Sequence, residues 1–182
     1  MAEKLERFDR IYRRYYTAVY RFVGRRVASA QVDDMTAEVF VVMWRRLGEM
    51  PREDRVLPWL YAVARRVLAN ETRRVQRARA LAEQMADQAE LRLGGDHAEA
   101  VIDRQLVAAA FDRLDERDQE VLRLVGWEGL SSAEVAAVLG CARTTAVMRI
   151  SRARRRLLKG LRAQEWHEPA GAPELERTKG TR

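Results

Sequence analysis

Apolar residues recur with a helical period along most of the chain, and no segment shows the sustained alternation that marks a β-strand. The first part contains three such stretches, at residues 4–27, 33–47 and 58–79. The second part contains four, near residues 105–113, 116–126, 131–139 and 143–162. We therefore predict an all-α protein made of two small helical domains joined by a linker.

Local signals set the boundaries of these units. Gly48 stops the second helix, and Pro58 suits the first turn of the third. Between Glu83 and Arg104 the composition becomes acidic and includes the pair Gly94-Gly95, which predicts a break. The divisions that we expect are a first domain at 1–80, a linker at 81–104, a second domain at 105–162 and a disordered tail at 163–182.

The second domain contains the pattern of a helix-turn-helix. Ser131 and Glu134 have the spacing of a capping box, in which each residue satisfies a free hydrogen-bonding group of the other at a helix start. Gly140 follows the apolar run and can adopt the left-handed conformation that ends a helix. Another helix begins a few residues later, which favours a helix-turn-helix over a single long helix.

The last helix is strongly basic, in a chain whose net charge is +7. Residues 143–162 carry many arginines and no acid, and Ala146, Ile150 and Ala153 share one sector that we expect to be buried with Leu157 and Leu161. Like charges on one helix repel each other, and binding to DNA phosphates would relieve that repulsion. The pattern therefore favours a DNA-binding surface over an ordinary solvated helix face. The residues expected to meet DNA are Arg143, Thr144, Val147, Met148, Arg149, Ser151, Arg152, Arg155 and Arg156.

Other kinds of chemistry find little support. The spacing of Asp33, Asp34 and Glu38 would allow a metal site, but no second acidic or histidine cluster supports it. The one cysteine, Cys141, excludes an internal disulfide and suits a small buried thiol better than a redox switch. With no apolar run long enough for a membrane and no secretion signal, we expect a soluble cytoplasmic protein. We also expect that it binds no metal or cofactor and is not an enzyme.

Three stretches taken together resemble a known family. They read "DDMTAEVFVVMWRRL", "LPWLYAVARRVLANETRR" and "AFDRLDERDQEVLRLVGWEGLSSAEVAAVLGCARTTAVMRISRARRRL". In order and spacing they resemble bacterial RNA polymerase sigma factors of the extracytoplasmic-function (ECF) type, over roughly residues 8–162. The resemblance implies two helical domains, region 2 and region 4, without the middle domain of housekeeping sigma factors.

The resemblance also implies partners and roles. Region 2 would dock on the β′ clamp helices of core RNA polymerase and open the minus-10 promoter element, and region 4 would bind the β flap and the minus-35 element. The implied polymerase-binding residues are Asp34, Glu38, Val41, Trp44 and Arg45, whereas Phe40 suits the core better. The implied minus-10 residues are Trp59, Tyr61, Arg65, Arg66, Asn70, Arg73, Arg74 and Arg77. The loop "GEMPREDRV" would hold a flipped base, and Trp59 suits either the core or base stacking.

Several positions depart from the family pattern. The usual asparagine and aspartate of the minus-10 helix are replaced by Arg66 and Asn70, and a common glutamine of the docking helix by Ala37. Ala142 and Val147 stand where polar contacts to the minus-35 element are usual. We therefore expect a promoter preference different from the commonest one of the family.

The sequence thus indicates an ECF sigma factor that binds core polymerase and both promoter elements, and we expect an anti-sigma protein as a further partner. One alternative is a helix-turn-helix regulator that binds duplex DNA without polymerase. Another is a polymerase-binding or anti-initiation adaptor whose basic helix is incidental. Binding to core polymerase followed by the start of transcripts separates the three.

Overall fold

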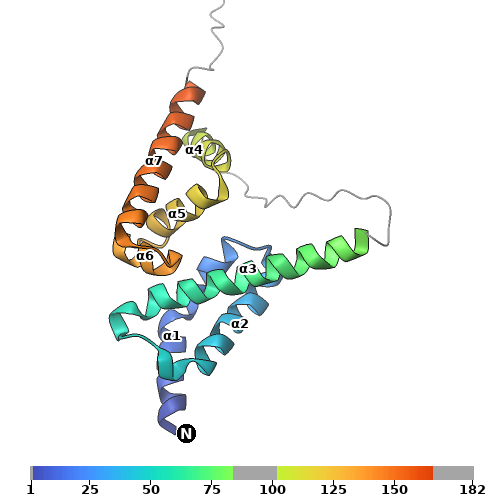
Figure 1. Ribbon diagram of the computed structural model, residues 1–182, viewed down its shortest axis with the longest axis vertical. Coiled ribbons are helices and arrows are strands. Elements are labelled where there is room, and N and C mark those ends of the chain that lie inside the picture. The colour runs from blue at the N-terminus through green and yellow to red at the C-terminus, as the bar shows by residue number, and fades with distance from the viewer. Residues whose placement is uncertain (1, 84–101, 166–182) are drawn as a thin grey trace, which may run out of the picture.

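The computed structural model describes residues 2–83 and 102–165, and this part of the chain folds entirely into helices and turns. The first half consists of α1 (Ala2–Gly24), α2 (Val32–Arg45) and α3 (Val56–Glu83). The second half consists of α4 (Ile102–Asp112), α5 (Glu116–Gly126), α6 (Ser132–Leu139) and α7 (Arg143–Glu165). Short 3₁₀ turns lie at Ser29–Gln31, Leu47–Glu49 and Glu53–Arg55. The all-α prediction is confirmed (Figure 1).

Helix ends follow from local chemistry. Both parts of the capping box form: Ser131 Oγ accepts from the Glu134 backbone N–H, and Glu134 Oε2 accepts from the Ser131 N–H at 2.8 Å. Gly140 ends α6 with a φ of 64°, a conformation that side chains with a Cβ rarely adopt. The turn between α6 and α7 is therefore the one predicted.

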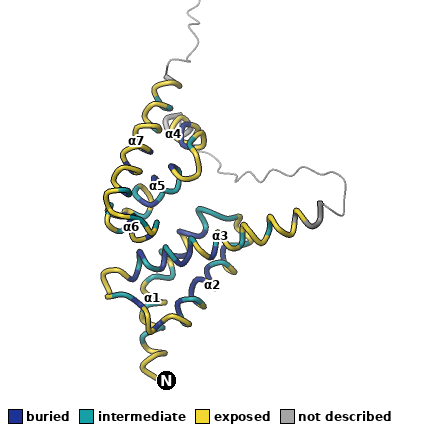
Figure 2. Tube along the Cα trace, viewed as in Figure 1, coloured by how far each residue is buried: buried dark blue, intermediate teal, exposed yellow. Residues whose placement is uncertain are grey.

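The first half is a three-helix bundle. Phe22 from α1, Met43 from α2 and Leu60 from α3 are completely enclosed, and they belong to one apolar cluster. Beyond this cluster the C-terminal part of α3 projects from the bundle, where its residues are mostly exposed (Figures 1 and 2). The helix therefore has a packed base and a long solvated arm.

The second half is built around α7. Ala146, Ile150 and Ala153 are buried against α5 and α6, and Leu157 and Leu161 are half-buried farther along the same sector. The predicted buried sector of this helix is confirmed, so its remaining positions are turned outward.

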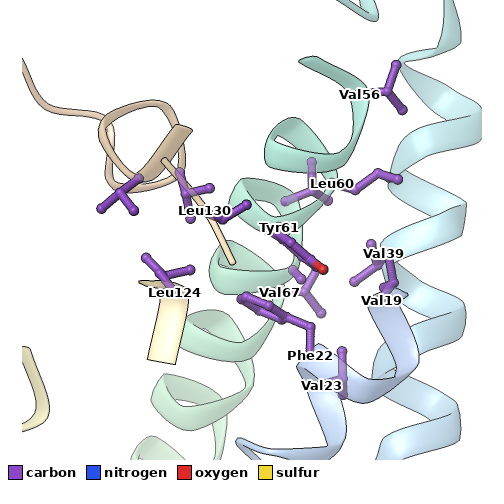
Figure 3. Close-up of a cluster of buried hydrophobic side chains, with 14 of the residues drawn as sticks. Val19, Phe22, Val23, Val39, Val56, Leu60, Tyr61, Val67, Leu124 and Leu130 are labelled. Carbon is purple, nitrogen blue, oxygen red and sulfur yellow. The ribbon is translucent and has the colours of Figure 1, made fainter. Parts of the chain in front are cut away.

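The two halves pack against each other. Figure 1 shows α6 lying across α3, and these two helices make many of the contacts between the halves. In Figure 3, Leu124 and Leu130 from the second half lie in the same buried cluster as Leu60 and Tyr61 of α3. The sequence did not predict this contact. None of the helices in the described ranges is both long and apolar enough to cross a membrane.

Candidate nucleic-acid interface

The outer face of α7 is a basic surface that also exposes apolar side chains. Eight of the positions predicted to meet DNA are exposed to solvent. They are Arg143, Thr144, Val147, Met148, Arg149, Ser151, Arg152 and Arg155. Val147 is 48% exposed and Met148 62%, although both are apolar. Apolar side chains on a basic helix suit contact with thymine methyl groups, while the arginines suit base edges and phosphates.

A groove of about 640 Å³ lies beside this surface, between the end of α5, the start of α6 and the middle of α7 from Val147 to Leu158. Its lining combines apolar side chains such as Leu130 and Val147 with the polar side chains of Ser132, Ser151 and Arg155. Hydroxyl and guanidinium donors next to a helix start are groups that commonly bind phosphate oxygens.

Arg156 differs from the other basic residues of α7. Its Nη1 lies 2.9 Å from Asp115 Oδ2 and 2.5 Å from Asp118 Oδ2, at the start of α5. The hydrogen bond to Asp118 raises the pKa of the Arg156 guanidinium. Arg156 thus joins α7 to α5 while its side chain stays 50% exposed, and its contact with DNA stays a prediction.

A second basic surface lies on the exposed arm of α3. The exposed members of the predicted minus-10 set are Arg66, Asn70, Arg73, Arg74 and Arg77. Arg73 Nη2 donates to Asn70 Oδ1 at 2.6 Å. Arg74 forms a two-pronged ion pair with Glu71, which lowers the pKa of the Glu71 carboxyl group. We call this surface the α3 ridge.

Three other members of the set lie away from the α3 ridge. Tyr61 is 3% exposed and its ring stacks on Phe22 at 4.5 Å between centroids. Arg65 is half-buried, and its Nη1 donates to the carbonyl oxygen of Val138 at 3.2 Å. Trp59 is half-buried and packs against the core. In this structure Tyr61 is enclosed beside Phe22 and Arg65 is bonded to α6, so neither stands on the exposed ridge, and their contacts with DNA stay predictions.

The predicted polymerase-binding residues lie along one side of α2. Asp34, Glu38, Val41 and Arg45 are exposed at helical spacing. Trp44 is half-buried, since its ring meets Phe8 edge-on at 5.3 Å and Lys4 Nζ at 4.7 Å. Phe40 is 3% exposed, which confirms its expected place in the core.

Other candidate chemistry can be placed as well. The described side chains contain no group of three His, Cys, Asp or Glu residues arranged to hold a metal ion, and this applies to Asp33, Asp34 and Glu38. Cys141 is a half-buried free thiol in the turn before α7. Both histidines fall outside the described residues.

Sequence reasoning missed a set of charged residues between the two halves. Arg25 and Arg26, just after α1, contact Glu120 in α5 and Glu128 in the loop after it. Arg65 Nε lies 3.0 Å from Glu120 Oε1. The partners are far apart in the sequence, so no local spacing could have paired them.

Comparison with known proteins gives two family matches. Residues 11–78 match the family model described as sigma-70 region 2, and residues 104–157 match sigma-70 region 4. The ECF RNA polymerase sigma factor SigC of Mycobacterium tuberculosis is 36% identical over 143 residues, which is 77% of this chain and 75% of SigC. The ECF sigma factor BldN of Streptomyces coelicolor is 31% identical over 145 residues, covering 76% of this chain and 54% of BldN.

Solved structures have a similar fold. The sigma factor RpoE of Bartonella quintana, determined with the anti-sigma factor NepR, aligns with a TM-score of 0.62 at 24% identity, over 85% of this chain and 96% of RpoE. CnrH, determined with the cytosolic domain of CnrY, aligns with a TM-score of 0.57 at 23% identity, over 86% of this chain and 88% of CnrH.

Proposed function

Since this chain belongs to the ECF sigma factors of bacterial RNA polymerase, which are transcription initiation factors, we propose how it divides that work between its surfaces. The outer face of α7 binds the minus-35 element, the α3 ridge handles the minus-10 element, and the exposed side of α2 docks on the β′ clamp helices. The domain division that goes with this is region 2 at 1–80, a linker at 81–104 and region 4 at 105–162, followed by a tail.

The observation that supports the DNA assignments most is the placement of basic side chains on two exposed helix faces. Arg149 and Arg152 stand outward on α7 beside exposed Met148, which is a suitable mixture for the major groove. On α3, Arg66 and Arg73 line a solvated arm, where a basic face can hold the backbone of a separated strand. Two separate basic faces suit a protein that contacts two promoter elements.

The polymerase assignment rests on the character of α2. Asp34 and Glu38 give it negative charge, and Val41 with half-buried Trp44 adds apolar area. A small apolar centre with charged residues around it is the usual composition of a protein interface. In this proposal catalysis belongs to the polymerase, and the chain supplies recognition and strand opening.

Regulation by an anti-sigma protein belongs to the same proposal. Membership of the family supports this proposal. In addition, the chain has two small domains, and a single partner could cover the functional faces of both. The alternative of a helix-turn-helix regulator that acts without polymerase is not favoured, since both sigma regions match.

Run-off transcription with purified core polymerase, followed by sequencing of the 5′ ends, tests the function. We expect transcripts that begin a fixed distance downstream of two shared sequence elements, and none when the chain is omitted. DNA binding without any polymerase-dependent transcript would contradict the proposal. That result would favour the alternative of a helix-turn-helix regulator that acts without polymerase.

A further inference from the structure

The N-terminal part of α7 carries a patch of uncharged side chains on its exposed surface. The patch consists of Thr144, Val147, Met148 and Ser151, which recur at helical spacing and are all exposed. We call this patch the neutral window. It offers methyl groups, a thioether and two hydroxyl groups, but no charge.

The neutral window contains two large apolar side chains. Met148 is 62% exposed and Val147 is 48% exposed. Val147 also lines the groove beside α7, whereas Met148 belongs neither to that lining nor to the apolar cluster formed by the described residues. Single exposed apolar side chains are common on protein surfaces, but these two are adjacent and stand among cations. Their apolar area is therefore available to a ligand.

Cations border the neutral window. Arg143 precedes it, and Arg152 and Arg155 follow it along the same exposed side of α7. Such a border fits a polyanion, and in a DNA duplex the phosphates line both edges of the major groove. The charges therefore favour duplex DNA as the occupant, with the neutral window over the base edges between the two rows of phosphates.

The position of the neutral window along α7 agrees with this placement. In a helix-turn-helix, the N-terminal residues of the second helix contact base edges in the major groove. Here the second helix is α7, and all four members of the neutral window lie in its N-terminal half. The side chains that reach the bases first are therefore uncharged.

Uncharged apolar side chains distinguish the bases by one group. In the major groove thymine presents a methyl group, whereas guanine presents two hydrogen-bond acceptors and cytosine an amino donor. Val147 and Met148 cannot donate a hydrogen bond, so a G·C pair beneath them would lose its water without replacement. They favour thymine through contact with its methyl group, and the unpaired polar groups of a G·C pair disfavour the alternative.

We propose that Val147 and Met148 read thymine methyl groups, so that the minus-35 element of this chain presents a thymine to each of these side chains. The inference rests on the proposed function, in which α7 binds that element. It goes further by naming the bases and the chemical group that are recognised. Thr144 and Ser151 discriminate less, because a hydroxyl group can both donate and accept.

Removal of the methyl groups tests the proposal. The free chain and the holoenzyme each select duplexes from a randomised library, and the selected sequences define the minus-35 element. Each thymine of that element is then replaced singly by deoxyuridine, which lacks only the methyl group. At two positions we expect binding to weaken about three- to tenfold, because the methyl group and the apolar side chain that it covers lose their contact.

Truncation of the side chains shows which of them reads each methyl group. Met148→Ala should weaken binding to the thymine duplex and make one deoxyuridine substitution nearly silent, and Val147→Ala should do the same at the other position. Arg152→Ala weakens binding through a different group and should keep both deoxyuridine effects. Val107→Ala is the matched control for Val147→Ala, because Val107 is 47% exposed on α4, away from the proposed DNA surface, and it should bind like wild type.

The possible results separate this inference from the proposed function. A minus-35 element without thymine would overturn the inference, and so would deoxyuridine effects that are equal in wild type, Met148→Ala and Val147→Ala. Normal transcription without any sensitivity to deoxyuridine would also overturn it and leave the proposed function standing. Coupling between the methyl groups and the two side chains in the free chain, without polymerase-dependent transcripts, would contradict the proposed function and support the inference.

Discussion

Arg156 in α7 is paired with Asp118 in the first turn of α5, with 2.5 Å between Nη1 and Oδ2. Asp118 is 6% exposed, so water reaches its carboxylate poorly and the guanidinium of Arg156 compensates its charge. The pair joins the basic helix to the helix before the helix-turn-helix. One arginine of the basic face therefore has a structural role, while its neighbours remain open to solvent.

Arg156→Ala should lower the melting temperature of the chain, because it leaves the Asp118 carboxylate buried without its cation. Arg155→Ala changes an exposed neighbour and should leave the melting temperature close to that of wild type. Thermal unfolding followed by circular dichroism compares the two variants. Equal melting temperatures would show that the pair contributes nothing to stability.

Arg152→Ala tests the outer face of α7. Arg152 is exposed in the middle of the basic surface, and loss of a two-pronged base contact should weaken promoter binding by about 1 to 3 kcal/mol. Holoenzyme assembly should not change, because α2 carries the proposed docking surface. Gel-shift titration of the holoenzyme on a promoter fragment measures the effect, and intact promoter binding would mean that another face of α7 meets the DNA.

Replacing Arg66 and Arg73 together with alanine tests the α3 ridge. Both side chains are exposed on the arm of α3, so assembly with polymerase should be nearly unchanged. Permanganate reactivity of unpaired thymines should fall, since the separated strand loses two cationic contacts. A promoter with a pre-melted bubble should recover much of the loss, because the cost of unpairing has been met. Lost assembly without rescue by the bubble would assign the ridge to polymerase.

Glu38→Arg tests the docking surface on α2. Reversal of an exposed charge at an electrostatically complementary interface should weaken core polymerase binding about tenfold or more. Glu49→Arg makes the same change on an exposed 3₁₀ turn and serves as the control. Affinity for core polymerase, measured by fluorescence anisotropy, should fall only for Glu38→Arg. An equal fall in both variants would indicate a general charge effect.

Tyr61 gives a prediction for alkaline pH. Burial, reinforced by Glu128, raises the pKa of Tyr61 from 10.0 to about 12. Between these values the unfolded chain has released the phenolic proton and the folded chain still holds it, so the free energy of unfolding falls as pH rises from 10 to 12. Tyr61→Phe removes this contribution. The difference in unfolding free energy, wild type minus Tyr61→Phe, should therefore be constant below pH 10 and decline above it, as measured by urea unfolding; a flat difference would contradict burial of the phenol.

The helices and the helix-turn-helix could be predicted because their signals are local. Ser131, Glu134 and Gly140 specify the ends of α6 through groups within a few residues of each other. The buried sector of α7 likewise follows from helical spacing alone. Neither prediction required knowledge of what lies across the core.

The contacts that the sequence did not predict join residues that are distant along the chain. Arg156 meets Asp118 38 residues away, and Arg25 meets Glu128 103 residues away. Tyr61 borders the buried sector of α3, and a helical wheel cannot tell that its ring stacks on Phe22 of α1. An arginine-rich face looks uniform in sequence, and only the fold separates the side chains that pair within the protein from those left exposed.

The contact between α3 and α6 is made within a single chain, so the docking equilibrium is unimolecular. Its effective concentration is set by the segment that joins the halves and does not depend on how many copies of the chain are made. A higher concentration of the chain therefore does not by itself change the fraction of molecules in which the two helices touch.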